Sequence, residues 1–156
     1  EMSRGLGDVY KRQVVHYADL VECLPYDDAV YMLKITGTQL ERMIRHILRD
    51  EAFQGEHTEF YQFSHGTHIV WSRSEQAFRT LTLDGEALYA ERLYTVAVQK
   101  YHYNNLKPFL DITLEEAEKN GKIRVLSTSA RDVVEEYLTV NQHLSREVEG
   151  RLVVED

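Results

Sequence analysis

The 156-residue sequence has little of what would tie it to a membrane, to nucleic acid or to a disulfide framework. Its one cysteine, Cys23, excludes a disulfide bond within the chain, and its apolar neighbours favour a buried side chain over a nucleophile. No apolar run approaches the roughly 20 residues that a helix needs to cross a bilayer. Acidic residues outnumber basic ones by 26 to 18, and the net charge of −8 repels a phosphate backbone. We therefore expect neither a membrane-spanning segment nor non-specific binding to nucleic acid.

The composition is typical of one globular domain with one core, with 43% hydrophobic and 28% charged residues. Residues 1–13 differ from the rest because they show neither helical nor strand periodicity. They also lack the apolar stretch of about 7–15 residues that a signal peptide requires. They are similar to the translated adapter sequence found at the ends of some environmental gene fragments. We interpret residues 1–13 as a non-native or disordered arm and residues 14–156 as the domain.

Helical and strand patterns are mixed along the domain. The strongest pattern predicts a helix over residues 38–50, capped by Thr38, because its apolar residues recur at the spacing of one buried face: Leu40, Met43, Ile44, Ile47 and Leu48. Asp84 and Gly85 predict a tight turn, and Ser129 predicts the start of a helix that continues to 138. Further helices are expected at 17–24 and 114–119, strands at 29–35, 67–72, 78–83, 94–98 and 151–154, and an irregular loop at 101–110. The pattern as a whole predicts a single α+β domain.

Six short motifs follow one another in a fixed order. They are Tyr17-Ala18-Asp19-Leu20, Leu24-Pro25-Tyr26, Leu33-Lys34-Ile35-Thr36-Gly37-Thr38-Gln39-Leu40, Gln62-Phe63-Ser64-His65-Gly66, Leu83-Asp84-Gly85-Glu86-Ala87-Leu88 and Tyr94-Thr95-Val96-Ala97-Val98. None is diagnostic by itself, but in this order and at these distances they resemble the C-terminal domain of the 5′-nucleotidase family. The resemblance extends over residues 17–154.

The resemblance implies the nucleotide- or nucleoside-binding domain of a phosphohydrolase. Members of the family join this domain to an N-terminal metallophosphoesterase domain that holds two divalent metal ions, and the C-terminal domain delivers the phosphate to those metals. The chain shows none of the paired G-x-H-type motifs common in two-metal sites. We therefore expect no catalytic residue, metal ligand or cofactor in this chain, a missing catalytic domain as its partner, and no hydrolysis by the chain alone.

The family grips the base between two aromatic rings, and the matching motifs place these rings at Phe63 and Tyr101. Stacking suits the task because every base has a flat π-face. His65 falls where the family often has a polar side chain near the edge of the base. The alternative interpretation is that Phe63 and Tyr101 are ordinary core aromatics.

The sequence departs from the family pattern at the positions that would contact the sugar and the phosphate. An acidic residue that binds the ribose hydroxyls often stands at about the position of Lys107, so Asn104 or Asn105 is the candidate substitute here. The family's phosphate-contacting arginine belongs to an Asn-Gly-Gly-x-Arg loop just before His16, where residues 1–13 lie instead.

The predicted helix 38–50 carries three arginines, Arg42, Arg45 and Arg49, at a spacing that lines one helical face. We interpret this as a solvated face on which Glu41 supports Arg45. Phosphate binding by Arg42 or Arg45 is the alternative.

Two other functions stay open. One is a free-standing small-molecule or nucleotide-binding module that has no catalytic partner. The other is a self-contained metal hydrolase that uses His65 and His68. These two side chains would point to opposite faces if a strand begins at Thr67, which favours two surface or partly buried histidines over a metal site.

Overall fold

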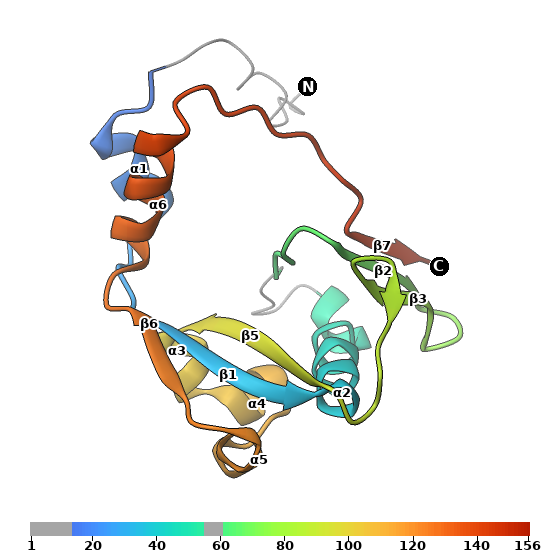
Figure 1. Cartoon of the computed structure of the whole chain (residues 1–156). Coiled ribbons are helices and arrows are strands. Elements are labelled where there is room, and N and C mark those ends of the chain that lie inside the picture. Colours follow the sequence, from blue (N-terminus) through green and yellow to red (C-terminus); the bar gives the residue numbers. More distant parts are fainter. Residues whose placement is uncertain (1–13, 55–60) are drawn as a thin grey trace.

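A computed structural model describes residues 14–54 and 61–156, which form two β-sheets with helices around them (Figure 1). The three-stranded sheet is antiparallel and has the order β5 (Leu93–Gln99), β1 (Val30–Thr36), β6 (Arg124–Ser127). The four-stranded sheet has the order β4 (Glu86–Ala87), β3 (Ala77–Leu83), β2 (Thr67–Ser72), β7 (Leu152–Glu155), and only its β2–β7 pair is parallel. The helices are α1 (Tyr17–Cys23), α2 (Gly37–Ile47), the 3-10 helix η2 (Asp50–Phe53), α3 (Lys100–Asn104), α4 (Leu106–Leu110), α5 (Leu114–Asn120) and α6 (Ala130–Val140). The predicted α+β class is confirmed.

The step from β1 into α2 shows how the sequence sets local structure. In β1 the side chains of Leu33 and Ile35 are buried and that of Lys34 is exposed, as the alternation of a strand requires. The hydroxyl of Thr36 then accepts from the backbone N–H of Gln39 at 3.2 Å, and the Gln39 side chain accepts from the Thr36 N–H at 2.8 Å. This capping box starts the helix two residues before the Thr38 cap that we predicted, so that prediction was wrong.

One continuous cluster of buried hydrophobic side chains joins both sheets to the helices. The buried face predicted for the helix is confirmed. All five of its apolar side chains are buried, four on α2 and one directly after it: Leu40, Met43, Ile44, Ile47 and Leu48. Trp71 of β2 is 1% exposed and meets the ring of Phe78 in β3 edge-on, with centroids 4.8 Å apart. The cluster also takes in Leu33 and Ile35 of β1, Leu106 and Leu110 of α4, Ile112, and Ala117 of α5.

The predicted tight turn at Asp84 and Gly85 is confirmed. Both residues have positive φ, +50° and +80°, and they connect β3 to β4. Positive φ at both central residues is the requirement of the hairpin turn that matches the twist of its strands.

The irregular loop predicted over residues 101–110 is wrong, because the chain forms the short helices α3 and α4 there. Asn105 separates the helices with a non-helical backbone (φ −127°, ψ 34°). Pro108 lies in the first turn of α4, where a missing N–H breaks no helical hydrogen bond. The signal for α4 was the pair Leu106 and Leu110, four residues apart and both buried.

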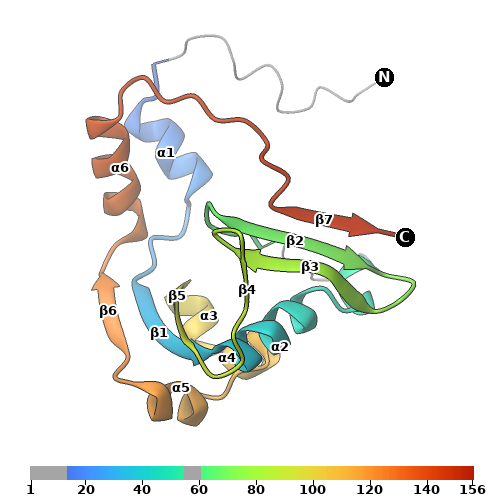
Figure 2. The same cartoon turned by 45° about the vertical axis from the view of Figure 1, so that its right-hand side comes forward.

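Helices α1 and α6 lie side by side, away from the two sheets (Figure 1 and Figure 2). Ser129 caps α6 as predicted, since its hydroxyl accepts from the N–H of Asp132 at 2.9 Å. The same hydroxyl donates to Asp27, which also accepts from the N–H of Arg131, and these bonds lower the pKa of Asp27. Cys23, for which a buried position was expected, is exposed at the end of α1. In the described part of the chain, no helix is long and apolar enough to cross a membrane.

Candidate functional site

Phe63 lies in the segment that leads into β2, with its ring half-buried against the core. Its carbonyl oxygen accepts a hydrogen bond from Nη1 of Arg151 at 2.6 Å. Three residues later, Gly66 turns the chain with a φ of +84°, and its carbonyl accepts from the N–H of Asp84 at 2.8 Å. A Cβ on Gly66 would stand 2.0 Å from an Asp84 carboxylate oxygen and would push that side chain aside, and the positive φ disfavours any other residue in this turn.

His65 is anchored to the C-terminal end of the chain. Its side chain is 84% exposed, and Nδ1 lies 3.0 Å from Oε2 of Glu149. Nε of Arg151 donates to the same oxygen at 2.8 Å. The hydrogen bond from Arg151, and after it the one with His65, lowers the pKa of Glu149 to about 2. That His65 lies near the edge of a bound base stays a prediction.

His68 lies on β2 and is exposed, next to the fully buried Ile69. Across residues 14–54 and 61–156, no three His, Cys, Asp or Glu side chains gather closely enough to hold a metal ion. The described residues therefore offer no fit for the metal centre of a hydrolase.

Tyr101 lies on α3 within a cluster of aromatic rings. It is 49% exposed, and its ring centroid lies 5.5 Å from that of His102 and 5.4 Å from that of Phe109. His102 also meets the ring of Tyr61 at 5.2 Å with an interplanar angle of 64°. Tyr61 precedes Phe63 by two residues, so this contact joins the segment that carries Phe63 to the helix that carries Tyr101.

A pocket of about 360 Å³ lies elsewhere and contains none of the predicted site residues. Its aromatic wall consists of Tyr31 and Tyr103, which stack on each other with centroids 4.1 Å apart and planes at 1°. That spacing leaves no room for a third ring between them. The remaining lining residues are Glu118, Gly121, Lys122, Ile123, Arg124 and Val125.

The residues predicted to lie at the ribose follow Tyr101 along the chain: Asn104 on α3, Asn105 between the two helices and Lys107 on α4. Asn104 is exposed at the last position of α3. The side chain of Asn105 donates to the carbonyl of Tyr101 at 2.8 Å. Lys107 forms an ion pair with Asp111 one helical turn away, and its hydrogen bond is the main reason that the pKa of Asp111 is lowered. A carboxylate thus stands within reach of Lys107, at the residue that follows α4.

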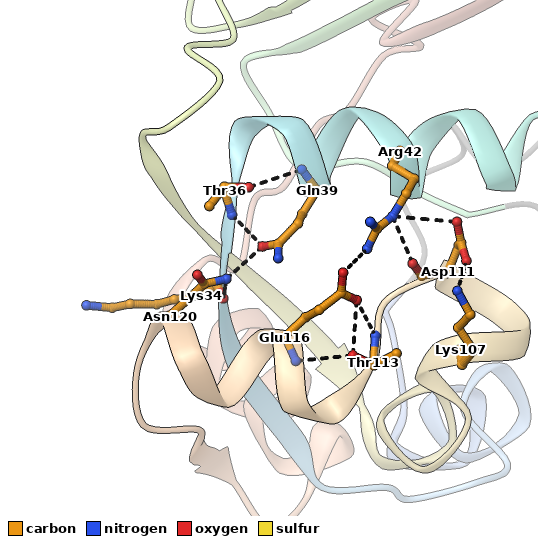
Figure 3. A network of polar contacts seen from close by, with 9 residues as sticks. All are labelled: Lys34, Thr36, Gln39, Arg42, Lys107, Asp111, Thr113, Glu116 and Asn120. Carbon is orange, nitrogen blue, oxygen red and sulfur yellow. Dashed lines mark hydrogen bonds and ion pairs between the residues drawn. The ribbon is translucent and has the colours of Figure 1, made fainter.

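Arg42 forms a polar network that joins α2 to the segment between α4 and α5 (Figure 3). Its Nη2 donates to Glu116 at 2.7 Å, and its Nε donates to the carbonyl of Asp111 at 3.1 Å and lies 3.5 Å from the Asp111 carboxylate. Glu116 also accepts from the N–H of Thr113, which lowers its pKa more than the bond from Arg42 does. A phosphate at Arg42 would have to displace two carboxylates.

Arg45 has different partners from Arg42, although both lie on α2. It pairs with Glu41 at 2.9 Å, as the sequence predicted. Its Nη1 donates to the carbonyl of Gln76 at 2.9 Å, and its guanidinium lies over the rings of Phe78 and Trp71, at 5.0 and 5.5 Å. Arg45 therefore packs α2 against the β2–β3 hairpin.

The sequence patterns did not point to four residues that lie near the predicted rings: Tyr61, His102, Glu149 and Arg151. Tyr61 and His102 adjoin the predicted positions, so their nearness in sequence was a usable signal. Arg151 is 88 residues from its partner Phe63, and no local pattern could reveal that contact.

Known proteins share this sequence pattern and this fold. A family model described as the C-terminal domain of 5′-nucleotidase matches residues 3–110. A search among curated proteins found no match. Among solved structures, a 5′-nucleotidase precursor from Thermus thermophilus is similar with a TM-score of 0.74 and 16% identity, over 91% of this chain and 28% of that one. A putative 5′-nucleotidase from Staphylococcus aureus, in complex with α-ketoglutarate, has a TM-score of 0.61 and 16% identity, over 92% and 30%. The chain thus spans less than a third of either structure's length.

Proposed function

The chain belongs to the 5′-nucleotidase C-terminal domain family, and from this premise we propose that it binds a nucleotide or nucleoside by stacking the base between Phe63 and Tyr101. The observation that supports this most is the ring contact between Tyr61 and His102, at 5.2 Å. It holds together two segments that are distant in sequence and that carry the two proposed stacking rings. Tyr101 is half exposed, so one ring already has a surface open to a ligand.

The neighbouring polar groups suit a base and a sugar. Because Glu149 accepts only, Nδ1 of His65 carries the proton between them, and Nε2 of a neutral His65 is then an acceptor. An acceptor at the edge of the base fits the exocyclic amine of adenine or cytosine. Asn104 and Asn105 offer amide groups for the ribose hydroxyls, while Lys107 brings a positive charge to the neighbouring helix α4.

The hydrolytic step of the proposed phosphohydrolase is assigned to a second, N-terminal metallophosphoesterase domain. That domain would hold the two divalent metal ions, which supply Lewis-acid chemistry at the phosphate. This chain would contribute recognition alone, since it would fix the base and leave the phosphate free to reach the partner domain. Neither Arg42 nor Arg45 is needed for that task, because each has carboxylate and backbone partners of its own.

The test is a calorimetric titration of the chain with adenosine, in wild type and in the variants Phe63→Ala and Tyr101→Ala. Loss of one stacking ring is worth about 1–3 kcal/mol, so the dissociation constant should rise about fivefold to more than a hundredfold. Tyr26→Ala is the matched control, because Tyr26 is 83% exposed and lies before β1, outside the ring cluster around Tyr101. Unchanged affinity in both ring variants would refute the proposal, and unfolding of both would support the core-aromatic interpretation.

A further inference from the structure

Arg151 links three parts of the molecule with one side chain. It lies one residue before β7, and its side chain is 33% exposed. Nη1 donates to the carbonyl of Phe63 at 2.6 Å, and Nε donates to Glu149 at 2.8 Å. Glu149 in turn bonds to His65 at 3.0 Å. The guanidinium and its carboxylate partner therefore reach both residues that flank Ser64.

The backbone around Arg151 is fixed as well. Its carbonyl accepts from the N–H of Ile69 at 2.8 Å, and from there β7 runs parallel to β2, with Leu152 opposite Ile69. Ile69 is fully buried. The backbone of Arg151 is thus fixed beside β2. Its side chain extends to the segment that precedes β2, where it contacts the Phe63 carbonyl.

The geometry suits an arginine in particular. A planar guanidinium presents several N–H groups in fixed directions, so one side chain can hold a carbonyl and a carboxylate at once. A lysine has a single, flexible ammonium and cannot keep both partners in this arrangement. A binding ring is more effective when its position is fixed before the ligand arrives, since less conformational freedom is lost on binding.

We propose that Arg151 is a positioning residue for base recognition: with Glu149, it holds the segment Phe63–His65 in the place where the Phe63 ring can stack on a base. The inference rests on the proposed function, because it gives Phe63 its role in stacking. Arg151 itself does not touch the base. Its effect on binding passes through the Phe63 carbonyl and the Glu149–His65 contact.

The first test needs no ligand. Amide hydrogen exchange is measured across the chain in wild type, Arg151→Ala, Arg151→Lys and Glu149→Gln. Exchange in residues 63–67 should accelerate about tenfold or more in Arg151→Ala and less in Arg151→Lys, while β1 and α2 keep their protection. Arg79→Ala is the matched control, because Arg79 holds the other end of β7 through Glu155 at 3.2 Å and lies near none of these residues. Unchanged exchange at 63–67 in Arg151→Ala and Glu149→Gln would overturn the inference.

The second test is adenosine binding in a double-mutant cycle. Arg151→Ala should raise the dissociation constant about tenfold in wild type and much less in a Phe63→Ala background, because the ring that Arg151 positions is missing there. An equal loss in both backgrounds would overturn the inference, since Arg151 would then act independently of Phe63. If wild type binds no adenosine while exchange at 63–67 responds as expected, the proposed function fails and the anchoring role of Arg151 stands. Glu149→Gln covers the case in which Arg151→Ala does not fold.

Discussion

Replacing Arg42 by alanine distinguishes a structural arginine from a phosphate-binding one. The variant loses the 2.7 Å bond to Glu116 and the bond to the Asp111 carbonyl. Glu116 then lacks the guanidinium beside it, while Asp111 keeps its ion pair with Lys107. A hydrogen bond to a charged group contributes about 1.5–3 kcal/mol. The side chains of Arg42 and Glu116 are 39% and 30% exposed, so solvent screening reduces this. We expect the free energy of unfolding to fall by about 1–2 kcal/mol.

The assay is urea unfolding followed by the fluorescence of Trp71, with Arg49→Ala as the matched control. Arg49 has a similar exposure, 40%, but its carboxylate partner Glu51 is 3.9 Å away and its hydrogen bond goes to the nearby carbonyl of His46, so its removal should cost less, about 0.5–1 kcal/mol. In Glu116→Gln the effect of Arg42→Ala should shrink, because the two residues share one contact. Equal stability of Arg42→Ala and wild type, together with weaker binding of AMP but not of adenosine, would refute the structural role.

The same network predicts that the stability contributed by Arg42 depends on pH. The folded pKa of Glu116 and that of Asp111 are both lowered from their ordinary values of 4.5 and 3.8. Carboxylates with lowered pKa contribute stability that is fully present above the unfolded pKa and lost as pH falls through the folded one. The stability difference between wild type and Arg42→Ala should therefore be constant above about pH 5.5 and shrink below about pH 4.5. A difference that grows as the pH falls from about 5.5 to about 3 would contradict the assignment.

Three further predictions use simple assays. The chain alone should release phosphate from AMP, ADP or UDP-glucose far below about 1 per second, even with manganese or zinc added, and turnover at an ordinary enzymatic rate would sink its assignment as the recognition half. Adenosine should be preferred to 2′-deoxyadenosine less than about tenfold, with Lys107→Asp raising the preference, whereas a strong preference in wild type would assign ribose binding to Asn104 or Asn105. Gly66→Ala should destabilise the fold by about 2 kcal/mol and Gly85→Ala by about 1, because both have positive φ but a Cβ at Gly66 would also displace the Asp84 carboxylate. Equal effects in thermal unfolding would contradict this.

The parts of the fold that the sequence predicted well are those fixed by short-range patterns. The buried face of α2, the strands β2 and β3 and the turn at Asp84 each depend on neighbours within a few residues. The strand β6 (Arg124–Ser127) gave no such signal, because three of its four side chains are exposed at the edge of the sheet. Helices α3 and α4 were missed because Asn105 and Pro108 look like loop residues, whereas Asn105 only separates the two helices and Pro108 fits the first turn of α4.

In the candidate site, too, the residues that short-range motifs predict differ from those that only the folded structure reveals. Motif order placed Phe63, His65 and Tyr101 on two segments that the fold brings together through Tyr61 and His102. The contacts of Arg42 with Glu116 and of Arg151 with Phe63 span 74 and 88 residues, and they depend on how sheets and helices pack. Spacing on one helix could not show that Arg42 and Arg45 have separate partners.

The most direct measurement is a crystal structure of the chain with adenosine bound. We expect the base to lie between the rings of Phe63 and Tyr101, with the Phe63 carbonyl still bonded to Arg151 and the ribose toward Asn104 and Asn105. Adenosine bound elsewhere, for example in the pocket beside Tyr31 and Tyr103, with the Phe63 ring still packed on the core, would contradict the proposed base site.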